Sequence, residues 1–400
     1  MPLAYLLLGS VAAVYAWAVV VLTYNHPGTI GPNYNAPGTD YMVFHTAAAL
    51  ALRGDLAKLY NPDAFTALLN QTYHGYLSAQ LEFRPWIYPP SFLLPLLPFS
   101  AFGFPLAFWL FQAVTGVAMI AGLRAALGPR AGWVCAAALA CPAASICFVS
   151  GQCSFLIVAL LAGGVGLLDR RPTLAGVLLG LLSCKPQFFV LVPVLLAARM
   201  SWRAAVAAAA TCVVMALASL VWFGPAIWTG WFDAMAQSAS GSDERWFLLG
   251  RLWGVSVYAC AYLLSASPGV AGMAQAGAII LGVCCVWCAF RTPMPAASRA
   301  AVMLAAALLV APHAGGYDLV LLVAACGLFL SQPGTHADNR DSLLCLAVWL
   351  GPLLGLPIIS VFGRFVPLLT FALVIRVLWH AGAVQRFATL APQPDAAAGR

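Results

Sequence analysis

The sequence predicts an all-α polytopic membrane protein, built as one helical bundle of about ten full spans plus one half-helix hairpin. Of its 400 residues, 63% are hydrophobic and only 8% are charged, whereas a soluble globular protein carries about 25% charged residues. Long apolar runs without charge recur along the chain, as expected of transmembrane helices. Residues 1–380 are therefore expected to form a single transmembrane domain, and the tail 381–400 is expected to be disordered in the cytoplasm.

The basic residues support this interpretation. The net charge of +7 does not indicate a nucleic-acid partner, because most arginines lie between apolar runs in the positive-inside pattern. These arginines are Arg124, Arg130, Arg170, Arg171, Arg199, Arg203, Arg291, Arg299 and Arg340. Their distribution predicts a multi-pass protein of the inner (plasma) membrane with both termini in the cytoplasm. The 12 cysteines mostly fall inside apolar runs, without a disulfide framework or metal-ligand spacing.

The apolar runs give the order of the spans. No Lys or Arg precedes Arg53 and the first run is about 20 residues long, so it is interpreted as an uncleaved span rather than a signal peptide. Full spans are expected at residues 3–23, 104–123, 131–149, 154–168, 204–223, 271–290, 299–312, 317–330, 342–357 and 364–380. An extra span at 252–264 is rejected, because it would place Arg291 and Arg299 outside.

Two external loops are expected, and the first, 24–103, contains two short helices. One begins near Thr39 and presents an apolar face of Tyr41, Phe44, Ala48 and Leu52. The other has Asn61 as its N-cap and Pro62 at its first position, with an apolar stripe of Phe65, Leu68, Leu69 and Tyr73. Both are expected to lie on the bilayer as interfacial helices. The second loop, 224–270, is aromatic and mixed, and a helix is expected to pack there at the interface.

Residues 173–198 are expected to form the half-helix hairpin. They are apolar except for Lys185-Pro186-Gln187 at their centre, and arginines lie at both ends. Proline breaks a helix, and broken backbone within a membrane is tolerated only where it lines protein or a wet cavity. A lysine at mid-bilayer costs about 2.5–3.5 kcal/mol on insertion scales, so Lys185 is expected to have a partner or a task. The structural alternative is snorkelling to helix-end carbonyls.

The order of the spans brings several polar residues to one place. Those that fall at the external face are Asp40, Gln152, His313 and Asp318, and Lys185 approaches the same region from within the bilayer. A carboxylate partly desolvated beside lipid can have a raised pKa and accept a hydroxyl proton, so Asp40 is the candidate catalytic base. Lys185 is the candidate cation for a lipid phosphate. Further candidates for contacts to a donor phosphate or sugar are Arg84, Tyr88, Gln187 and Tyr317.

Most of these residues also have a purely structural interpretation. An Asp in the first turn of a helix, such as Asp40, is stabilised by the helix dipole. Gln152 is also placed to cap the helix that starts near Ser154, and Asp318 to cap the helix after a Gly-Gly bend. A bend between two helices accounts for the glycines, but it gives no reason for a histidine at position 313.

The motifs that would indicate other chemistry are missing. The sequence has no P-loop, GxGxxG, HExxH, paired Cys-His cluster or GxSxG context. Nucleotide and ATP chemistry are therefore disfavoured, and neither a cofactor nor a metal is expected.

An ordered set of short motifs resembles glycosyltransferase family 87, a member of the GT-C superfamily of polytopic transferases. The motifs are Gly38-Thr39-Asp40-Tyr41 with Phe44, Leu59-Tyr60-Asn61-Pro62, Tyr88-Pro89-Pro90, Gly151-Gln152, Lys185-Pro186-Gln187, and Pro312-His313 with Tyr317-Asp318. The resemblance runs from about residue 1 to 380 in the order of the family. It implies a GT-C-type bundle.

The resemblance also implies a reaction. It is a metal-independent, inverting sugar transfer from a polyprenyl-phosphate donor, which in characterised members carries mannose, to a growing lipoglycan. The acidic base in the family's first external loop matches Asp40, and its active-site histidine after a late proline matches His313. The expected partners are therefore a polyprenyl-phosphate sugar, a glycolipid or glycan acceptor and membrane lipids, and the active site is expected to face the periplasm.

Two other classes of function remain open from the sequence. A transporter or flippase of a lipid-linked sugar would use the same cavity and Lys185. Secondary transporters usually show inverted repeats with broken helices in both halves, whereas the sequence shows one broken helix pair, the hairpin at 173–198. A transport function also gives no reason for the large first loop. A structural membrane partner is disfavoured by the buried lysine and the ordered external loop.

Overall fold

The structure is a computed structural model that describes residues 38–77, 80–81, 83–240, 245, 254–332 and 338–382. Within these residues every regular element is helical, and the one strand-like pairing is an isolated bridge between Gly254 and Gly315. The predicted first span at 3–23 and nearly all of the predicted tail 381–400 lie outside the described residues. The all-α prediction is thus confirmed for the part of the chain that the structure describes.

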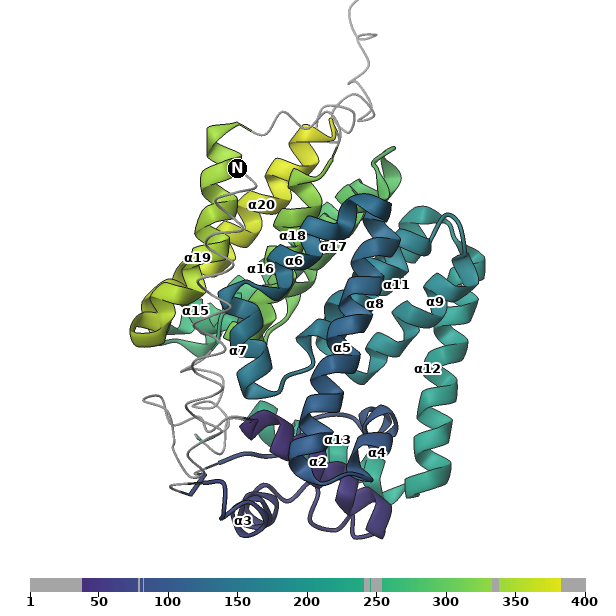
Figure 1. Cartoon of the computed structure of the whole chain (residues 1–400), viewed down its shortest axis with the longest axis vertical. Helices are drawn as coiled ribbons and strands as arrows, with labels where there is room; N and C mark the ends of the chain where they lie inside the picture. Colours follow the sequence, from purple (N-terminus) through teal and green to yellow (C-terminus); the bar gives the residue numbers. More distant parts are fainter. Residues whose placement is uncertain are drawn as a thin grey trace, which may run out of the picture.

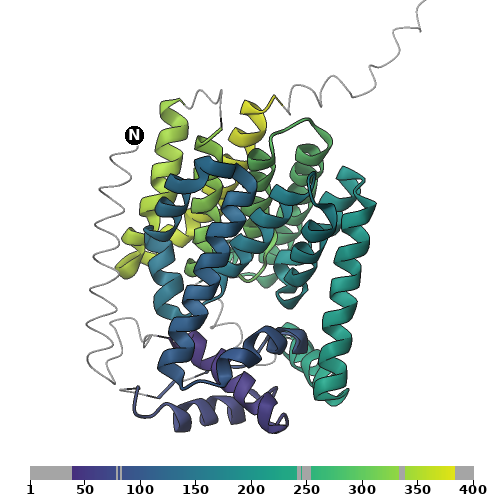
Figure 2. The ribbon, with the colours of Figure 1, turned by 45° about the vertical axis from the view of Figure 1, so that its right-hand side comes forward.

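The helices form a bundle with a smaller layer across its lower end (Figures 1 and 2). The bundle comprises α5 (Phe104–Leu127), α6 (Ala131–Leu139), α7 (Pro142–Ser150), α8 (Ser154–Leu167), α9 (Pro172–Leu181), α10 (Pro186–Phe189), α11 (Val192–Arg199), α12 (Trp202–Phe223), α15 (Val257–Ser265), α16 (Pro268–Arg291), α17 (Ala296–Val310), α18 (Leu319–Leu330), α19 (Asn339–Phe362) and α20 (Val366–His380). The cross layer, as it is called below, comprises α2 (Thr39–Arg53), α3 (Pro62–Thr72), α4 (Leu93–Ser100) and α13 (Ala226–Ser240). Short 3₁₀ turns join them at η1 (Pro90–Phe92), η2 (Gly128–Arg130), η3 (Leu182–Cys184), η4 (Gly316–Asp318) and η5 (Gly363–Phe365).

Three helical stretches in the described chain are long and apolar enough to cross a membrane by length and composition. They are Phe104–Leu139, Trp202–Phe223 and Pro268–Arg291. Other apolar helices are shorter, and the 15 residues of α17 span only about 22 Å at 1.5 Å per residue, against a hydrocarbon core of about 30 Å. Apolar helices therefore indicate a membrane protein, while the count of ten spans stays a prediction.

The bundle packs through small residues that let helix backbones approach closely. A Cβ added at Gly122 of α5 would lie 2.5 Å from the carbonyl oxygen of Ala159 on α8, and one added at Gly176 of α9 would lie 2.2 Å from that of Ala204 on α12. Such contacts are typical of helix pairs in membranes, where dispersion rather than the hydrophobic effect drives association. They fix α5 against α8 and α9 against α12.

The predicted hairpin at 173–198 is confirmed in its main feature. The helix stops at η3, resumes at Pro186 after Lys185, and has a second break between α10 and α11. Asp169, just before α9, accepts a hydrogen bond of 3.0 Å from Arg199 Nε at the end of α11 and is also paired with Arg299. Since one carboxylate joins the two ends of the hairpin, the chain enters and leaves on the same side of the bundle. In Figure 1 this end lies opposite the cross layer.

The predicted span at 131–149 is not one continuous helix. It breaks between α6 and α7, where Cys141 is the N-cap of α7 and Pro142 occupies its first position. Proline has no backbone N–H to donate and its ring clashes with the preceding turn, so the axis changes direction there. The sequence prediction overlooked this break because Pro142 lies within a long, almost entirely apolar run.

The two short helices of the first loop exist, but one of them is placed differently from the prediction. Asn61 caps α3 by accepting a hydrogen bond from the backbone N–H of Ala64, with Pro62 at the first position, as predicted. The predicted apolar face of α2 holds except for Leu52, which is 50% exposed. Most other residues of α2 are buried on all sides, because α4 and α5 pack against it. It is therefore part of a core rather than a one-sided interfacial helix.

Candidate active site

Asp40 lies in the first turn of α2, which is anchored to the end of α7. Gly38, the N-cap of α2, has φ of +75° and its N–H donates to the carbonyl of Val149 over 2.6 Å. Gly151, the C-cap of α7, has φ of +79°, and a Cβ there would lie 2.4 Å from Cβ of Tyr41. Both glycines are needed in left-handed conformations that other residues adopt at a cost. These two contacts fix the position of Asp40 relative to the bundle.

Gln152 reaches Asp40 from the turn between α7 and α8. Its Nε2 donates to Oδ2 of Asp40 over 2.9 Å, and its Oε1 accepts from the backbone N–H of Cys153 over 3.4 Å. The second contact orients the amide so that its donor side faces the carboxylate. The alternative that Gln152 caps α8 is wrong, because Cys153 is the N-cap and no side chain caps that helix.

Asp40 opens into a cavity of about 170 Å³ between the cross layer and the bundle. Five of the predicted site residues line it, namely Asp40, Arg84, Tyr88, Gln152 and Tyr317. The remaining lining residues are Thr39, Val43, Phe44, Pro85, Ile87, Ile146, Ser150 and Gly316. The cavity is smaller than the roughly 300–1,000 Å³ of typical small-molecule sites, so without ligand it has room for one small group.

The carboxyl group of Asp40 is held in an environment that disfavours its charge. Protein surrounds it on most sides, and this burial raises its pKa above the ordinary value. The charge of Arg84, the hydrogen bond from Gln152 and the charge of Lys185 oppose the rise without cancelling it. A carboxylate with a raised pKa is a stronger base than one in water, which suits it to accept a proton.

Lys185 lies at the break of the hairpin, next to Tyr88 but outside the cavity lining. It is 2% exposed, and its Nζ lies 5.5 Å from the centre of the Tyr88 ring and 5.8 Å from that of Phe188. Its charge interacts with Cys153, Tyr88, Asp318 and Tyr317. Attraction between a cation and aromatic faces is strongest where water is excluded. The predicted need of Lys185 for partners is therefore met by rings and by a carboxylate.

Asp318 is a buried carboxylate that interacts electrostatically with Lys185. It accepts hydrogen bonds from Ser154 Oγ over 2.6 Å and from the backbone N–H of Gly315 over 3.0 Å. It is 2% exposed and is not part of the cavity lining. Asp318 occupies the predicted N-cap position of α18, but its side chain does not cap that helix. It closes the turn at η4 instead, and its bond from Ser154 ties this turn to the start of α8.

Tyr88 is fixed by an aromatic cluster. Its ring centre lies 4.9 Å from that of Phe92, 5.1 Å from that of Trp86 and 5.2 Å from that of Phe44. The hydroxyl of Tyr60 donates to its backbone carbonyl over 2.8 Å. Burial raises the pKa of Tyr88, so its phenol stays neutral and can both donate and accept hydrogen bonds at the cavity wall.

Four of the nine predicted site residues do not line the cavity. Two of them, Lys185 and Asp318, are the buried residues described above. His313 is exposed on the segment before η4, and Gln187 is half-buried on α10; neither lines the cavity. Other residues of the site had no predicted role. Ser154 was identified only as a helix start, although its position two residues after Gln152 is a signal for a contact near the same turn. Trp231 of α13 donates from Nε1 to the carbonyl of Ile87 over 3.3 Å and so holds the segment around Ile87 and Tyr88 that lines the cavity. Nothing in the sequence around Trp231 indicates this contact.

The described residues offer no ready metal site, since no three His, Cys, Asp or Glu side chains gather among them as ligands would. The polar side chains that line the cavity are one carboxylate, one amide, two phenols, two hydroxyls and one guanidinium, and Lys185 and Asp318 lie close behind Tyr88 and Tyr317. Such a set can bind a hydroxyl-rich ligand with a negative charge and can accept a proton from it.

Comparison with known proteins identifies the family. The model of glycosyltransferase family 87 matches residues 86–312, more than half of the chain. Tyr88, Gln152 and Lys185 lie inside the matched region, while Asp40 precedes it. No curated protein and no solved structure gives a significant match. The resemblance found in the sequence motifs is confirmed, and the chain belongs to glycosyltransferase family 87, a family of membrane glycosyltransferases.

Proposed function

We propose that this glycosyltransferase moves a hexose, with mannose as the first candidate, from a polyprenyl-phosphate donor to a lipid-linked or envelope glycan acceptor. The transfer inverts the anomeric centre, and Asp40 is the general base. The observation that carries the proposal is the position of Asp40. It is a carboxylate with a raised pKa, bound to Gln152 and opening into a cavity beside two cations.

The proton transfer follows from the surroundings of Asp40. Gln152 occupies Oδ2, and among the described residues no hydrogen bond reaches Oδ1. An acceptor hydroxyl in the cavity can therefore donate its hydrogen bond to Oδ1. As the acceptor oxygen attacks the anomeric carbon, its proton passes to Asp40. One carboxylate is enough, because no glycosyl-enzyme forms, unlike in retaining hydrolases with two carboxylates.

The two cations suit the leaving group. The bond from the anomeric carbon to the phosphate oxygen breaks as the new glycosidic bond forms, and its electrons stay on the phosphate. Negative charge then builds on that phosphate, and fixed cations stabilise such charge best in a site that excludes water. Arg84, which lines the cavity, and Lys185, which is buried beside Tyr88, are the candidates, since both act electrostatically on Asp40. His313, which is exposed and does not line the cavity, stays a prediction.

The membrane arrangement is part of the proposal. The cross layer lies at the opposite end of the bundle from the arginines around Asp169. By the positive-inside rule, these arginines belong on the cytoplasmic side. The cavity would then open on the periplasmic side, where a polyprenyl-phosphate sugar in the outer leaflet can reach it. A transporter or flippase of the same lipid remains the alternative function, which family membership disfavours.

Asp40→Asn tests the proposal directly. Purified protein in detergent is given labelled polyprenyl-phosphate mannose and an acceptor extract, and transferred label is counted. Loss of a general base lowers turnover by about 10²–10⁴-fold, while donor binding should change little, because Asn keeps the shape of the side chain. Asp55→Asn is the matched control, since Asp55 is an exposed carboxylate paired with Lys58 near the end of α2.

The outcome discriminates between the candidates. Full activity of Asp40→Asn would remove Asp40 from the mechanism. Movement of the labelled lipid across liposomes without any transfer would favour the flippase. Transfer of another sugar in preference to mannose would keep the mechanism and change the donor.

A further inference from the structure

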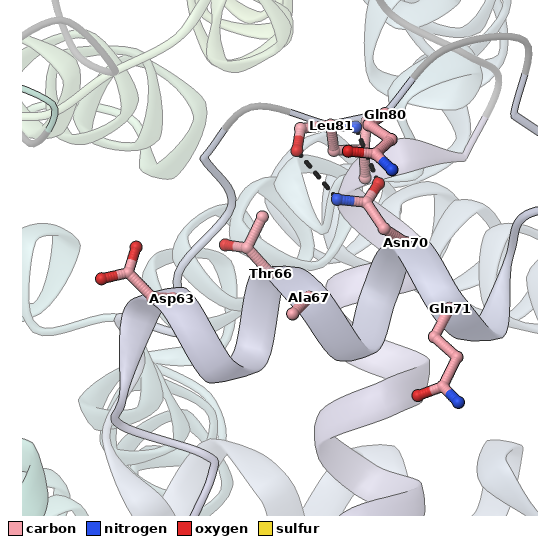
Figure 3. A pocket seen from close by; sticks show the side chains of 7 residues that line it. All are labelled: Asp63, Thr66, Ala67, Asn70, Gln71, Gln80 and Leu81. Carbon is pink, nitrogen blue, oxygen red and sulfur yellow. Dashed lines mark hydrogen bonds between the residues drawn. The ribbon is translucent and has the colours of Figure 1, made fainter.

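A second cavity lies in the cross layer, apart from the site around Asp40. It measures about 460 Å³ and is lined along α3 by Asp63, Thr66, Ala67, Asn70 and Gln71, and across from α3 by Gln80 and Leu81 (Figure 3). We call it the α3 hollow. Its volume falls in the range of roughly 300–1,000 Å³ that small-molecule sites occupy. Nothing in the proposed reaction around Asp40 uses it.

The walls of the hollow are fixed to each other. The side chain of Asn70 donates from Nδ2 to the carbonyl of Leu81 over 2.9 Å and accepts through Oδ1 from the N–H of the same residue over 2.7 Å. Figure 3 shows both bonds bridging α3 and the segment across from it. Because a single side-chain amide pairs with both backbone groups of Leu81, these two hydrogen bonds set the separation of the two walls. The hollow is thus a built feature of the fold.

The hollow and the cavity at Asp40 share one segment of chain. Thr66 Oγ1 accepts a hydrogen bond from the backbone N–H of Arg84 over 3.0 Å, and the side chain of Arg84 lines the cavity at Asp40. Leu81, which lines the hollow, is only three residues earlier. The hollow therefore adjoins the stretch of chain that brings Arg84 to the cavity at Asp40.

The chemistry of the lining selects a class of ligand. Gln71 and Gln80 are exposed amides that offer both donors and acceptors, and Asp63 adds a carboxylate at the rim. Among the described residues that line the hollow there is no Lys or Arg, which a phosphate or an anionic lipid headgroup would need. Asp63 is also paired with Arg245 over 2.6 Å, so its charge is offset. The lining suits a neutral ligand rich in hydroxyl groups.

We propose that the α3 hollow binds a distal sugar of the acceptor glycan, one or more residues away from the hydroxyl that attacks. This inference rests on the proposed function. It makes the enzyme prefer acceptors that already carry several sugars, because a longer acceptor gains hydrogen bonds in the hollow while its terminal hydroxyl lies at Asp40. The donor does not use the hollow, since its lipid tail must stay in the membrane.

Ala67→Trp tests the inference by filling the hollow from an exposed position on α3. Thr72→Trp is the matched control, because Thr72 is exposed on the same helix but does not line the hollow. Transfer is measured to methyl glycosides with one, two, three and four mannose residues. In Ala67→Trp, kcat/KM for the longer acceptors should fall roughly 10- to 100-fold, the loss of two or three neutral hydrogen bonds. The one-sugar acceptor should be unaffected.

Binding measured without turnover separates this inference from the proposed function. Methyl mannotrioside is titrated onto wild type, Ala67→Trp and Thr72→Trp in lipid nanodiscs by saturation-transfer NMR. Signals that are lost only in Ala67→Trp support the hollow as a sugar site, even if wild type transfers no sugar and the proposed function fails. Equal rates of Ala67→Trp and wild type for every acceptor would overturn the inference. An equal loss for the one-sugar and the longer acceptors would overturn it as well.

Discussion

The amide nitrogen of Gln152 donates a hydrogen bond of 2.9 Å to Oδ2 of Asp40, although 112 residues separate the two in the chain. Gln152 belongs to the bundle and Asp40 to the cross layer. The orientation of the carboxylate is therefore set by the turn between α7 and α8 as well as by its own helix. The hydrogen bond also favours the charged form of Asp40 against the effect of burial.

Replacement of Gln152 should change the pH dependence of the reaction. Gln152→Leu removes a donor to the charged carboxylate, so the pKa of Asp40 rises further and the acidic limb of the kcat profile shifts to higher pH. Gln152→Glu should be more severe, because two adjacent carboxylates resist ionising together. The measurement is kcat between pH 5 and 9. Identical profiles for wild type and Gln152→Leu would contradict the assigned role.

Gln112→Leu is the control for that experiment. Gln112 is buried on α5, and neither of its amide atoms has a hydrogen-bond partner among the described residues. Replacing an unsatisfied buried amide with an apolar group of similar shape is neutral or stabilising. Gln112→Leu should therefore keep the wild-type pH profile and an equal or higher melting temperature.

Asp40→Asn should stabilise the protein at neutral pH although it lowers turnover strongly. The folded pKa of Asp40 is raised above the unfolded value, so folding favours the protonated form. That favourable contribution is complete below the unfolded pKa and is lost as pH rises through the folded pKa. Asn mimics the protonated group and keeps the acceptor for Gln152. Thermal unfolding of wild type and Asp40→Asn at several pH values should show a gap that widens as pH increases, and a constant or reversed gap would contradict it.

The sequence was sufficient for the all-helical fold, for several helix starts and breaks, and for bringing Asp40 and Gln152 together. Asn61 and Pro62 marked the start of α3, because capping depends on local residue types that are visible without tertiary structure. The Lys185-Pro186 pair marked the break of the hairpin for a similar reason. The order of the spans brought Asp40 and Gln152 to one face, and the structure joins them by a hydrogen bond.

The sequence was not sufficient for features that depend on packing. The burial of α2 on all sides follows from its contacts with α4 and α5, which helical periodicity does not encode. The break at Pro142 was hidden in an apolar run. His313 and Asp318 lie in the same short motif, yet one is exposed and the other is buried against Ser154. Only the local turn at η4 decides which of the two points inward.

Gly151→Ala adds only one methyl group, but it should lower both the activity and the stability of the protein. Its φ of +79° costs a residue with a Cβ about 1–2 kcal/mol, and its Cβ would also lie 2.4 Å from Cβ of Tyr41. The second effect pushes the start of α2, and with it Asp40, away from Gln152. We expect a lower melting temperature and a fall in kcat of at least about tenfold, since misplacement by 1 Å can cost about 10²-fold.

Alanine substitutions at two further glycines distinguish the backbone cost of a positive φ from the contact with Tyr41. Gly54 has φ of +71° with open space around it, so Gly54→Ala should show the backbone cost alone and keep its kcat. Gly116 lies inside α5 with no atom within 4 Å of an added Cβ, so Gly116→Ala should be neutral or stabilising. If Gly151→Ala and Gly54→Ala behaved alike in both assays, the contact with Tyr41 would have no role in placing Asp40.

Lys185 and Asp318 should be coupled in stability but not in activity. Each is 2% exposed, and each acts electrostatically on the other. Lys185→Met leaves the carboxylate of Asp318 buried without a counter-charge, and Asp318→Asn does the same to the ammonium group. The double variant removes both charges, so its loss of stability should be smaller than the sum of the single losses by about 0.5–3 kcal/mol. Transfer should stay abolished in the double variant, because the cation proposed to meet the donor phosphate is absent. Thermal unfolding and label transfer measured on all four proteins check both statements, and strictly additive stabilities would show that Lys185 depends on the aromatic faces of Tyr88 and Phe188 instead.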